Sequence, residues 1–159
     1  MNEKFSSTDI VEIAIEIEKN GRSFYEGFSR KAEDNAIAQF FSNMAEEEAQ
    51  HEKDFKAILS SVMSHQPCDA YPQEYFSYLN AVAGGYLFKD SDEFKERTSG
   101  IGSEKDAIDF SLGIEKDSIL LYEEIKKMIP DKERHLIESI INQEREHVKK
   151  LWDLRKPKA

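Results

Sequence analysis

Two Glu-x-x-His motifs stand in this sequence, Glu48 with His51 and Glu144 with His147. Residues three apart in a helix lie on one face, so each motif presents a carboxylate beside an imidazole. Both groups are ligands that first-row transition metals accept. A single pair of this kind is usually a surface ion pair, so the surrounding residues must decide between a metal site and a solvated helix face.

Both motifs fall within apolar stripes that repeat every three or four positions, the period of a buried helix face. The first stripe contains Ile37, Phe41, Met44, Phe55, Ile58 and Val62, and the second contains Ile137, Ile140, Leu151 and Leu154. The charged residues that fall off the first stripe are expected to be solvated: Glu46, Glu47, Glu52, Lys53 and Asp54. The stripes thus predict that the Glu and the His of each motif point inward.

Two further helical stripes each contain one carboxylate, Glu18 and Glu115. Glu18 is flanked by Val11, Ala14, Gly21, Tyr25 and Phe28, and Glu115 by Ile108, Ser111, Ser118, Tyr122 and Ile125. The segments IEKNGRSFYE (17–26) and IEKDSILLYE (114–123) show that the two halves of the chain are an internal repeat.

The depth of these side chains follows from the rise of a helix. Glu18 and Glu48 each lie about 15 residues from the turn near position 33, or roughly 22 Å along the helix axis. Glu115 and Glu144 flank Pro130 at nearly the same separation. All four carboxylates and both imidazoles are therefore expected to converge in the middle of the protein.

Four carboxylates in a core repel one another and lose their hydration, at a cost of several kcal/mol each. Protonation could relieve that cost, but two divalent cations would neutralise the set. The pattern therefore favours a site for two metal ions over a purely structural cluster. Ligand type alone does not separate Fe, Mn and Zn, since affinity order and availability decide between them.

The elements that must position these residues are four long helices, expected at about 9–31, 35–64, 104–129 and 131–155. The short connections within each pair make its two helices antiparallel neighbours. The crossover, about 65–103, is far longer than a usual loop and contains two stretches that resemble short helices, PQEYFSYLNAVA and SDEFKER. The sequence thus predicts one all-α domain over 1–159, a four-helix bundle of two antiparallel pairs.

Composition narrows the function classes. The net charge of −10 argues against a nucleic-acid partner. There is no apolar run of membrane-spanning length and no signal peptide in MNEKFSSTD, so we expect a cytoplasmic protein without a membrane partner. The single cysteine, Cys68, excludes disulfides and cysteine-rich metal sites within this sequence and is expected to be inert.

Glu from two helices and Glu-x-x-His from two others is the pattern of ferritin-like di-iron carboxylate proteins. The segments AIEIEKNGRSFYEGFSRKA, FFSNMAEEEAQHEKDF and AIDFSLGIEKDSILLYEEI resemble the rubrerythrin-like branch of that group. The resemblance implies a pair of iron ions, with Mn or Zn possible in their place. The residues that it implies as ligands are Glu18, Glu48, His51, Glu115, Glu144 and His147, with Glu48 and Glu144 as bridges.

Two departures from that family stand out. Rubrerythrins carry a rubredoxin domain with four cysteines on iron, whereas this sequence has only Cys68, so a separate rubredoxin-like protein or reductase is expected to supply electrons. Rubrerythrins also place an extra Glu one turn after the third-helix ligand, where this sequence has Ser118 and, at the repeat position, Gly21. Tyr25 and Tyr122 are either plain core aromatics or hydrogen-bond donors to carboxylates across the bundle.

The leading hypothesis is therefore a di-iron enzyme that reduces hydrogen peroxide or dioxygen, with no catalytic side chain beyond the metal ligands. The alternative is a ferroxidase or iron-handling protein, and a third reading is a metal-free bundle used for interactions. The resemblance also implies a homodimer or a larger homo-oligomer, with the crossover segment YPQEYFSYL as a contact surface.

Overall fold

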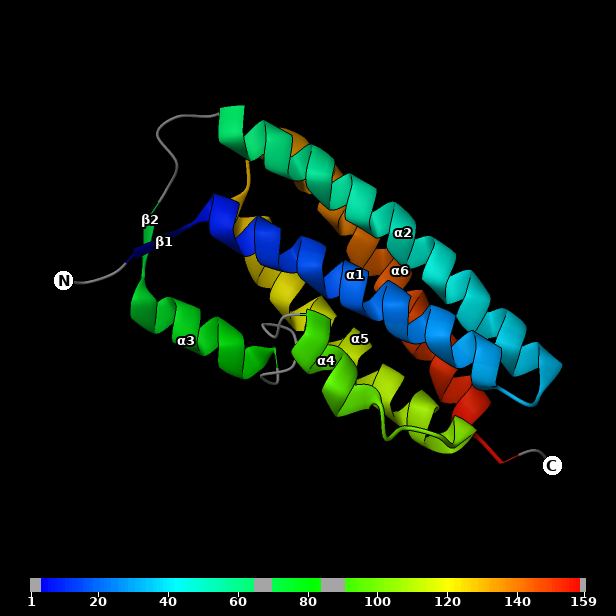
Figure 1. The fold of residues 1–159 in the computed structure, drawn as a ribbon. Coiled ribbons are helices and arrows are strands. Elements are labelled where there is room, and N and C mark those ends of the chain that lie inside the picture. The colour runs from blue at the N-terminus through cyan, green and yellow to red at the C-terminus, as the bar shows by residue number, and fades with distance from the viewer. Residues whose placement is uncertain (1–3, 65–69, 84–90, 158–159) are drawn as a thin grey trace.

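The computed structural model describes residues 4–64, 70–83 and 91–157. Within these ranges, four long helices lie side by side along most of their length (Figure 1). They are α1 (Ser7–Lys31), α2 (Asn35–Ser64), α5 (Glu104–Met128) and α6 (Arg134–Arg155). Helix α1 packs along α2, and α5 packs along α6, which confirms the expected all-α bundle of two helical pairs.

Side chains cap the start of each helix in the first pair. Ser6 and Asp9 form a capping box, in which Ser6 Oγ accepts from the Asp9 N–H at 3.2 Å and Asp9 accepts from the Ser6 N–H at 2.7 Å. This cap starts α1 two residues before the expected position. At the start of α2, the Asp34 carboxylate accepts from the N–H groups of Ala36 (2.8 Å) and Ile37 (3.1 Å).

The second pair begins and turns differently. Ser103 Oγ caps α5 by accepting from the Asp106 N–H at 3.0 Å. After Pro130, the residues Asp131–Glu133 form a 3-10 turn, so α6 begins at Arg134 and not at 131 as expected. Proline lacks an N–H and fixes its φ, which favours such a tight turn before the helix.

The crossover contains both expected short helices, α3 (Gln73–Val82) and α4 (Ser91–Thr98). It also contains a pairing that the sequence patterns did not predict. Strand β1 (Lys4–Ser6) lies antiparallel to β2 (Ala70–Pro72), with Phe5 opposite Tyr71. This crossover returns the chain along the bundle, so α2 and α5 run in the same direction (Figure 1). Cys68 lies outside the described residues.

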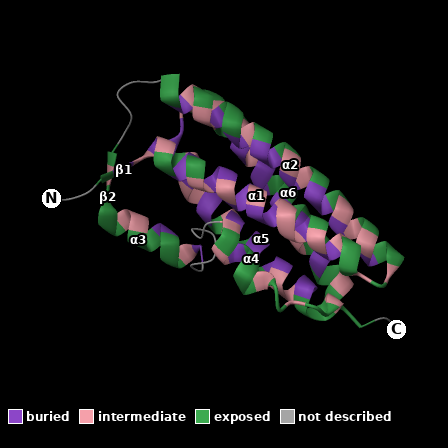
Figure 2. Ribbon diagram, viewed as in Figure 1, coloured by how far each residue is buried: buried purple, intermediate pink, exposed green. Residues whose placement is uncertain are grey.

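The buried residues lie on the sides of the long helices that face one another (Figure 2). Every member of the four predicted stripes is buried except Leu154, which is half-buried near the end of α6. The stripes thus form one continuous core around the middle of the bundle. Among the described residues, no helix is long and apolar enough to cross a membrane.

Candidate metal centre

The six residues predicted as ligands converge in the middle of the bundle, and each is at most 4% exposed. Helices α1 and α5 each contribute one carboxylate, while α2 and α6 each contribute a carboxylate and an imidazole. The side chains divide into two groups whose donor atoms lie within 4.8 Å of one another. One group is Glu18, Glu48, His51 and Glu144, and the other is Glu48, Glu115, Glu144 and His147.

Glu48 and Glu144 belong to both groups because each directs one oxygen toward each imidazole. His51 Nδ1 lies 2.7 Å from Oε1 of Glu144 and 3.4 Å from Oε2 of Glu48. His147 Nδ1 lies 3.4 Å from the other oxygen of Glu144 and 3.5 Å from the other oxygen of Glu48. The two remaining carboxylates each serve one side only: Glu18 lies 3.5 Å from His51, and Glu115 lies 3.3 Å from His147.

Several of these buried atoms make no hydrogen bond of acceptable geometry among the described residues, although His51 Nδ1 and Glu144 Oε1 lie 2.7 Å apart. They are Glu18 Oε2, Glu48 Oε1, His51 Nδ1 and Glu144 Oε1. A buried polar atom without a partner costs about 1–3 kcal/mol. Donor atoms of the carboxylates and imidazoles lie within 4.8 Å of one another in each group, an arrangement that a bound cation could satisfy. The donor set therefore fits two metal ions.

The pKa values of the clustered groups depart from their ordinary values in ways that follow from burial and from the neighbouring charges. Burial and the neighbouring carboxylates raise the pKa of Glu48 and Glu115 well above the ordinary value. Burial lowers the pKa of His51, but Glu144, Glu18 and Glu48 outweigh it and raise that pKa. Burial raises the pKa of Glu144, but hydrogen bonds with Glu115, His147 and His51 outweigh it and lower that pKa. These opposite shifts are expected where several acids and imidazoles lie close together in a buried site.

Two tyrosines fix the unshared carboxylates. The Tyr25 hydroxyl donates to Glu115, and the Tyr122 hydroxyl donates to Glu18, so each tyrosine reaches the opposite helical pair. Burial and nearby carboxylates raise the pKa of both tyrosines well above the ordinary value, which keeps the hydroxyls protonated as donors. Of the two readings of these residues, the structure therefore agrees with donors to carboxylates.

The sequence patterns missed the residues that hold the outer nitrogen of each imidazole. His147 Nε2 lies 2.7 Å from Glu47 Oε2, and His51 Nε2 lies 2.6 Å from Gln143 Oε1. Glu47 was expected to be solvated, but its side chain is only 40% exposed. The repeat held the signal, since Glu47 and Gln143 each stand one residue before the Glu of a Glu-x-x-His motif.

Glu52 also differs from expectation, because it is buried although it falls off the apolar stripe. Its carboxylate accepts hydrogen bonds from Arg22 of α1 at 3.3 Å and from Lys56 of α2 at 2.7 Å. These long cations shield Glu52 from solvent without removing its charge. The residue therefore joins α1 to α2 beside the cluster.

The positions of Gly21 and Ser118 supply no seventh carboxylate. Ser118 is buried, and its hydroxyl donates to the Ile114 carbonyl of its own helix at 2.8 Å. At Gly21, an added Cβ would lie 3.9 Å from the nearest carbons of Glu48 and Tyr25. Small residues thus occupy both equivalent positions next to the cluster.

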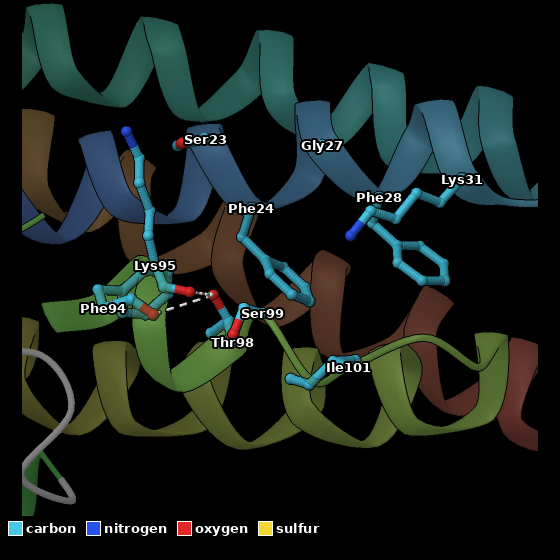
Figure 3. Close-up of a pocket in the computed structure, with 10 residues that line it drawn as sticks. All are labelled: Ser23, Phe24, Gly27, Phe28, Lys31, Phe94, Lys95, Thr98, Ser99 and Ile101. Atoms are coloured by element: carbon cyan, nitrogen blue, oxygen red, sulfur yellow. Dashed lines mark hydrogen bonds between the residues drawn. The ribbon is translucent and has the colours of Figure 1, made fainter. Parts of the chain in front are cut away.

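The cluster is separate from a pocket of about 150 Å³ that lies between α1 and α4 (Figure 3). That pocket is lined by aromatic rings, hydroxyls and two lysines, with Phe24, Phe94 and Lys95 among them. None of the six clustered residues lines it.

The fold and the buried cluster together define a ferritin-like four-helix bundle with a carboxylate- and imidazole-lined centre. The sequence matches the Rubrerythrin family over residues 9–155, and the chain belongs to that family. This confirms the resemblance drawn from the helical segments.

The structure is also similar to a crystal structure from Thermotoga maritima, of a protein described as ferritin-like and diiron-carboxylate. The two share 23% identity with a TM-score of 0.68, over 98% of this chain and 97% of the other. No curated protein matches the sequence.

Proposed function

We propose that the protein is a di-iron redox protein that reduces hydrogen peroxide or dioxygen. The observation that supports this most is the pair of overlapping donor groups, which share Glu48 and Glu144. In this proposal Glu48 and Glu144 would help to hold both ions, Glu18 and His51 would hold one of them, and Glu115 and His147 would hold the other. When bound, two ferrous ions would supply the two electrons that convert hydrogen peroxide and two protons to water.

The chain's own residues prepare the site for that chemistry. Burial of all six donors excludes bulk water, and the low local dielectric strengthens each charge interaction. Tyr25 and Tyr122 hold the unshared carboxylates in place through their hydroxyls. Gly21 leaves the flank of Glu48 without a side chain, which is where a small oxidant would have room to approach.

The electrons that restore the reduced state must come from another source. The sequence has one cysteine, so it contains no four-cysteine iron site of its own. We propose a donor outside these 159 residues, such as a rubredoxin-like protein or a reductase.

The second candidate is a ferroxidase or iron-handling function. The observation that favours it is the symmetric donor set, in which Gly21 and Ser118 add no further carboxylate. Under this reading the six donors would bind ferrous iron as a substrate, dioxygen would accept one electron from each ion, and the iron would leave in the ferric form.

One experiment separates the two candidates. The protein is loaded anaerobically with two equivalents of Fe²⁺, and oxidation by hydrogen peroxide and by dioxygen is followed by near-ultraviolet absorption. Fast stoichiometric reaction with peroxide and slow reaction with dioxygen supports the peroxide-reducing function. Preference for dioxygen, with iron uptake continuing beyond two ions per chain, supports iron oxidation. Failure to bind iron stoichiometrically would refute both.

A further inference from the structure

The two imidazoles differ in what holds their outer nitrogen. Each ring turns Nδ1 toward the carboxylates and Nε2 toward the partner helix. An imidazole that binds a metal through Nδ1 keeps its proton on Nε2, which must then donate. His147 therefore donates to the carboxylate of Glu47, whereas His51 donates to the amide oxygen of Gln143.

Apart from this difference, the site of Glu18 and His51 matches the site of Glu115 and His147. The repeat equates Glu18 with Glu115, and each of these carboxylates accepts from a tyrosine of the opposite helical pair. It also equates Glu47 with Gln143, yet one is an acid and the other an amide. The inner donors are thus chemically equal, and the outer contacts of the imidazoles are not.

A carboxylate acceptor affects the ring more strongly than an amide does. Hydrogen bonds to an ionised acceptor are roughly twice as strong as neutral ones. A carboxylate behind a metal-bound imidazole raises the basicity of the ligand, and removing such a partner typically costs about 10–100-fold in metal affinity. The negative charge of the Glu47 carboxylate also attracts a cation at the centre, whereas the amide of Gln143 is neutral.

We propose that Glu47 and Gln143 are positioning residues that make the two metal sites unequal. The site of Glu115 and His147 binds its ion more tightly and fills first, and the site of Glu18 and His51 fills second. This inference rests on the proposed di-metal function. It further implies that the second ion is released more readily than the first.

Glu47 has neighbours that must be controlled for. It lines a groove between α2 and α6 together with Glu46, Glu146 and Lys150. Any of these charges could change cation affinity without contacting an imidazole. Glu46 is exposed and lies one residue before Glu47, so Glu46→Gln removes the same charge from the same turn of the helix.

The test titrates metal-free full-length protein with Co²⁺, with calorimetry for affinity and visible absorption for the coordination of each ion. The wild type is expected to bind two ions with separate dissociation constants. Glu47→Gln should weaken the tighter step by about 10–100-fold. Gln143→Glu should strengthen the weaker step, and Glu46→Gln should leave both nearly unchanged. In Glu18→Ala, the remaining ion should keep the tighter constant.

Equal constants in the wild type, or equal effects of Glu47→Gln and Glu46→Gln, would overturn the inference. Gln143→Glu provides an independent test, because it replaces the amide acceptor of His51 with a carboxylate and does not depend on how Glu47 variants fold. Failure of the wild type to bind two ions would instead refute the proposed function, so the two failures are distinguishable.

Discussion

Tyr122 of α5 donates its hydroxyl hydrogen bond to Glu18 of α1, so a residue of one helical pair fixes a carboxylate of the other. Tyr25 does the same for Glu115 in the reverse direction. A hydrogen bond from a neutral donor orients a carboxylate without neutralising it. The geometry of the centre therefore depends on the packing of the two pairs against each other.

Replacing either tyrosine with phenylalanine should weaken metal binding by about 10–100-fold, since the unshared carboxylate loses its orienting donor. Metal titration of Tyr25→Phe and Tyr122→Phe measures this. Tyr75→Phe is the matched control, because Tyr75 also donates to a carboxylate, Glu124, away from the centre. If the control loses as much affinity as the other variants, the orienting role of Tyr25 and Tyr122 is wrong.

The shared and unshared carboxylates should differ in how many ions their loss removes. Glu48→Ala takes an oxygen from both donor groups, so we expect neither ion to bind stoichiometrically. Glu18→Ala affects one group only and should leave one ion per chain. Elemental analysis after gel filtration gives the count. If Glu48→Ala retains one ion, Glu48 is not shared between the two sites. If the wild type binds no metal, the protein is instead a metal-free bundle used for interactions.

Gly21→Ala should stabilise the metal-free protein by about 0.5–1 kcal/mol, because glycine inside a helix costs that much relative to alanine. The added Cβ meets its neighbours at 3.9 Å, an ordinary contact. Urea unfolding measures the change. Gly113→Ala, with nothing within 4 Å of its Cβ, reports the helix-propensity gain alone. A destabilised Gly21→Ala beside a stabilised Gly113→Ala would mean that the space next to Glu48 is needed for folding.

Removing the metal should lower the unfolding temperature. A ligand that binds only the folded state at 100 times its dissociation constant stabilises it by about 2.7 kcal/mol. For a chain of this size that corresponds to a shift of roughly 5–10 °C. Calorimetric scans with and without Co²⁺ measure it, and Glu48→Ala should show no metal-dependent shift. If the unfolding temperature of the wild type is the same with and without Co²⁺, the metal does not bind at the buried cluster.

Much of the bundle could be predicted because helix periodicity marks which side chains face inward. Glu48 and His51 stand in a stripe of apolar residues, and the rise of a helix places them at the depth of Glu18. The β1–β2 pairing could not be predicted in this way. It joins residues about 66 positions apart, Phe5 and Tyr71, and strands of three residues leave no periodic signal.

The sequence patterns also failed to predict the burial of polar side chains that contact a neighbouring helix. Glu52 is buried by cations from two helices, and Glu47 turns toward an imidazole of α6. Neither residue lies on an apolar stripe, so periodicity assigns both to solvent. Long side chains at the edge of a buried face can contact residues of the neighbouring helix. Which residue they contact depends on how the helices pack.

The centre draws its donors from both helical pairs, and none of the six is more than 4% exposed. A chelator in solution would therefore have no direct contact with ions held there. Loss of metal would require transient separation of α1 and α2 from α5 and α6, and its rate would follow the frequency of that opening. Amide hydrogen exchange in the middle of the helices and the half-life of the bound ion would then report the same motion.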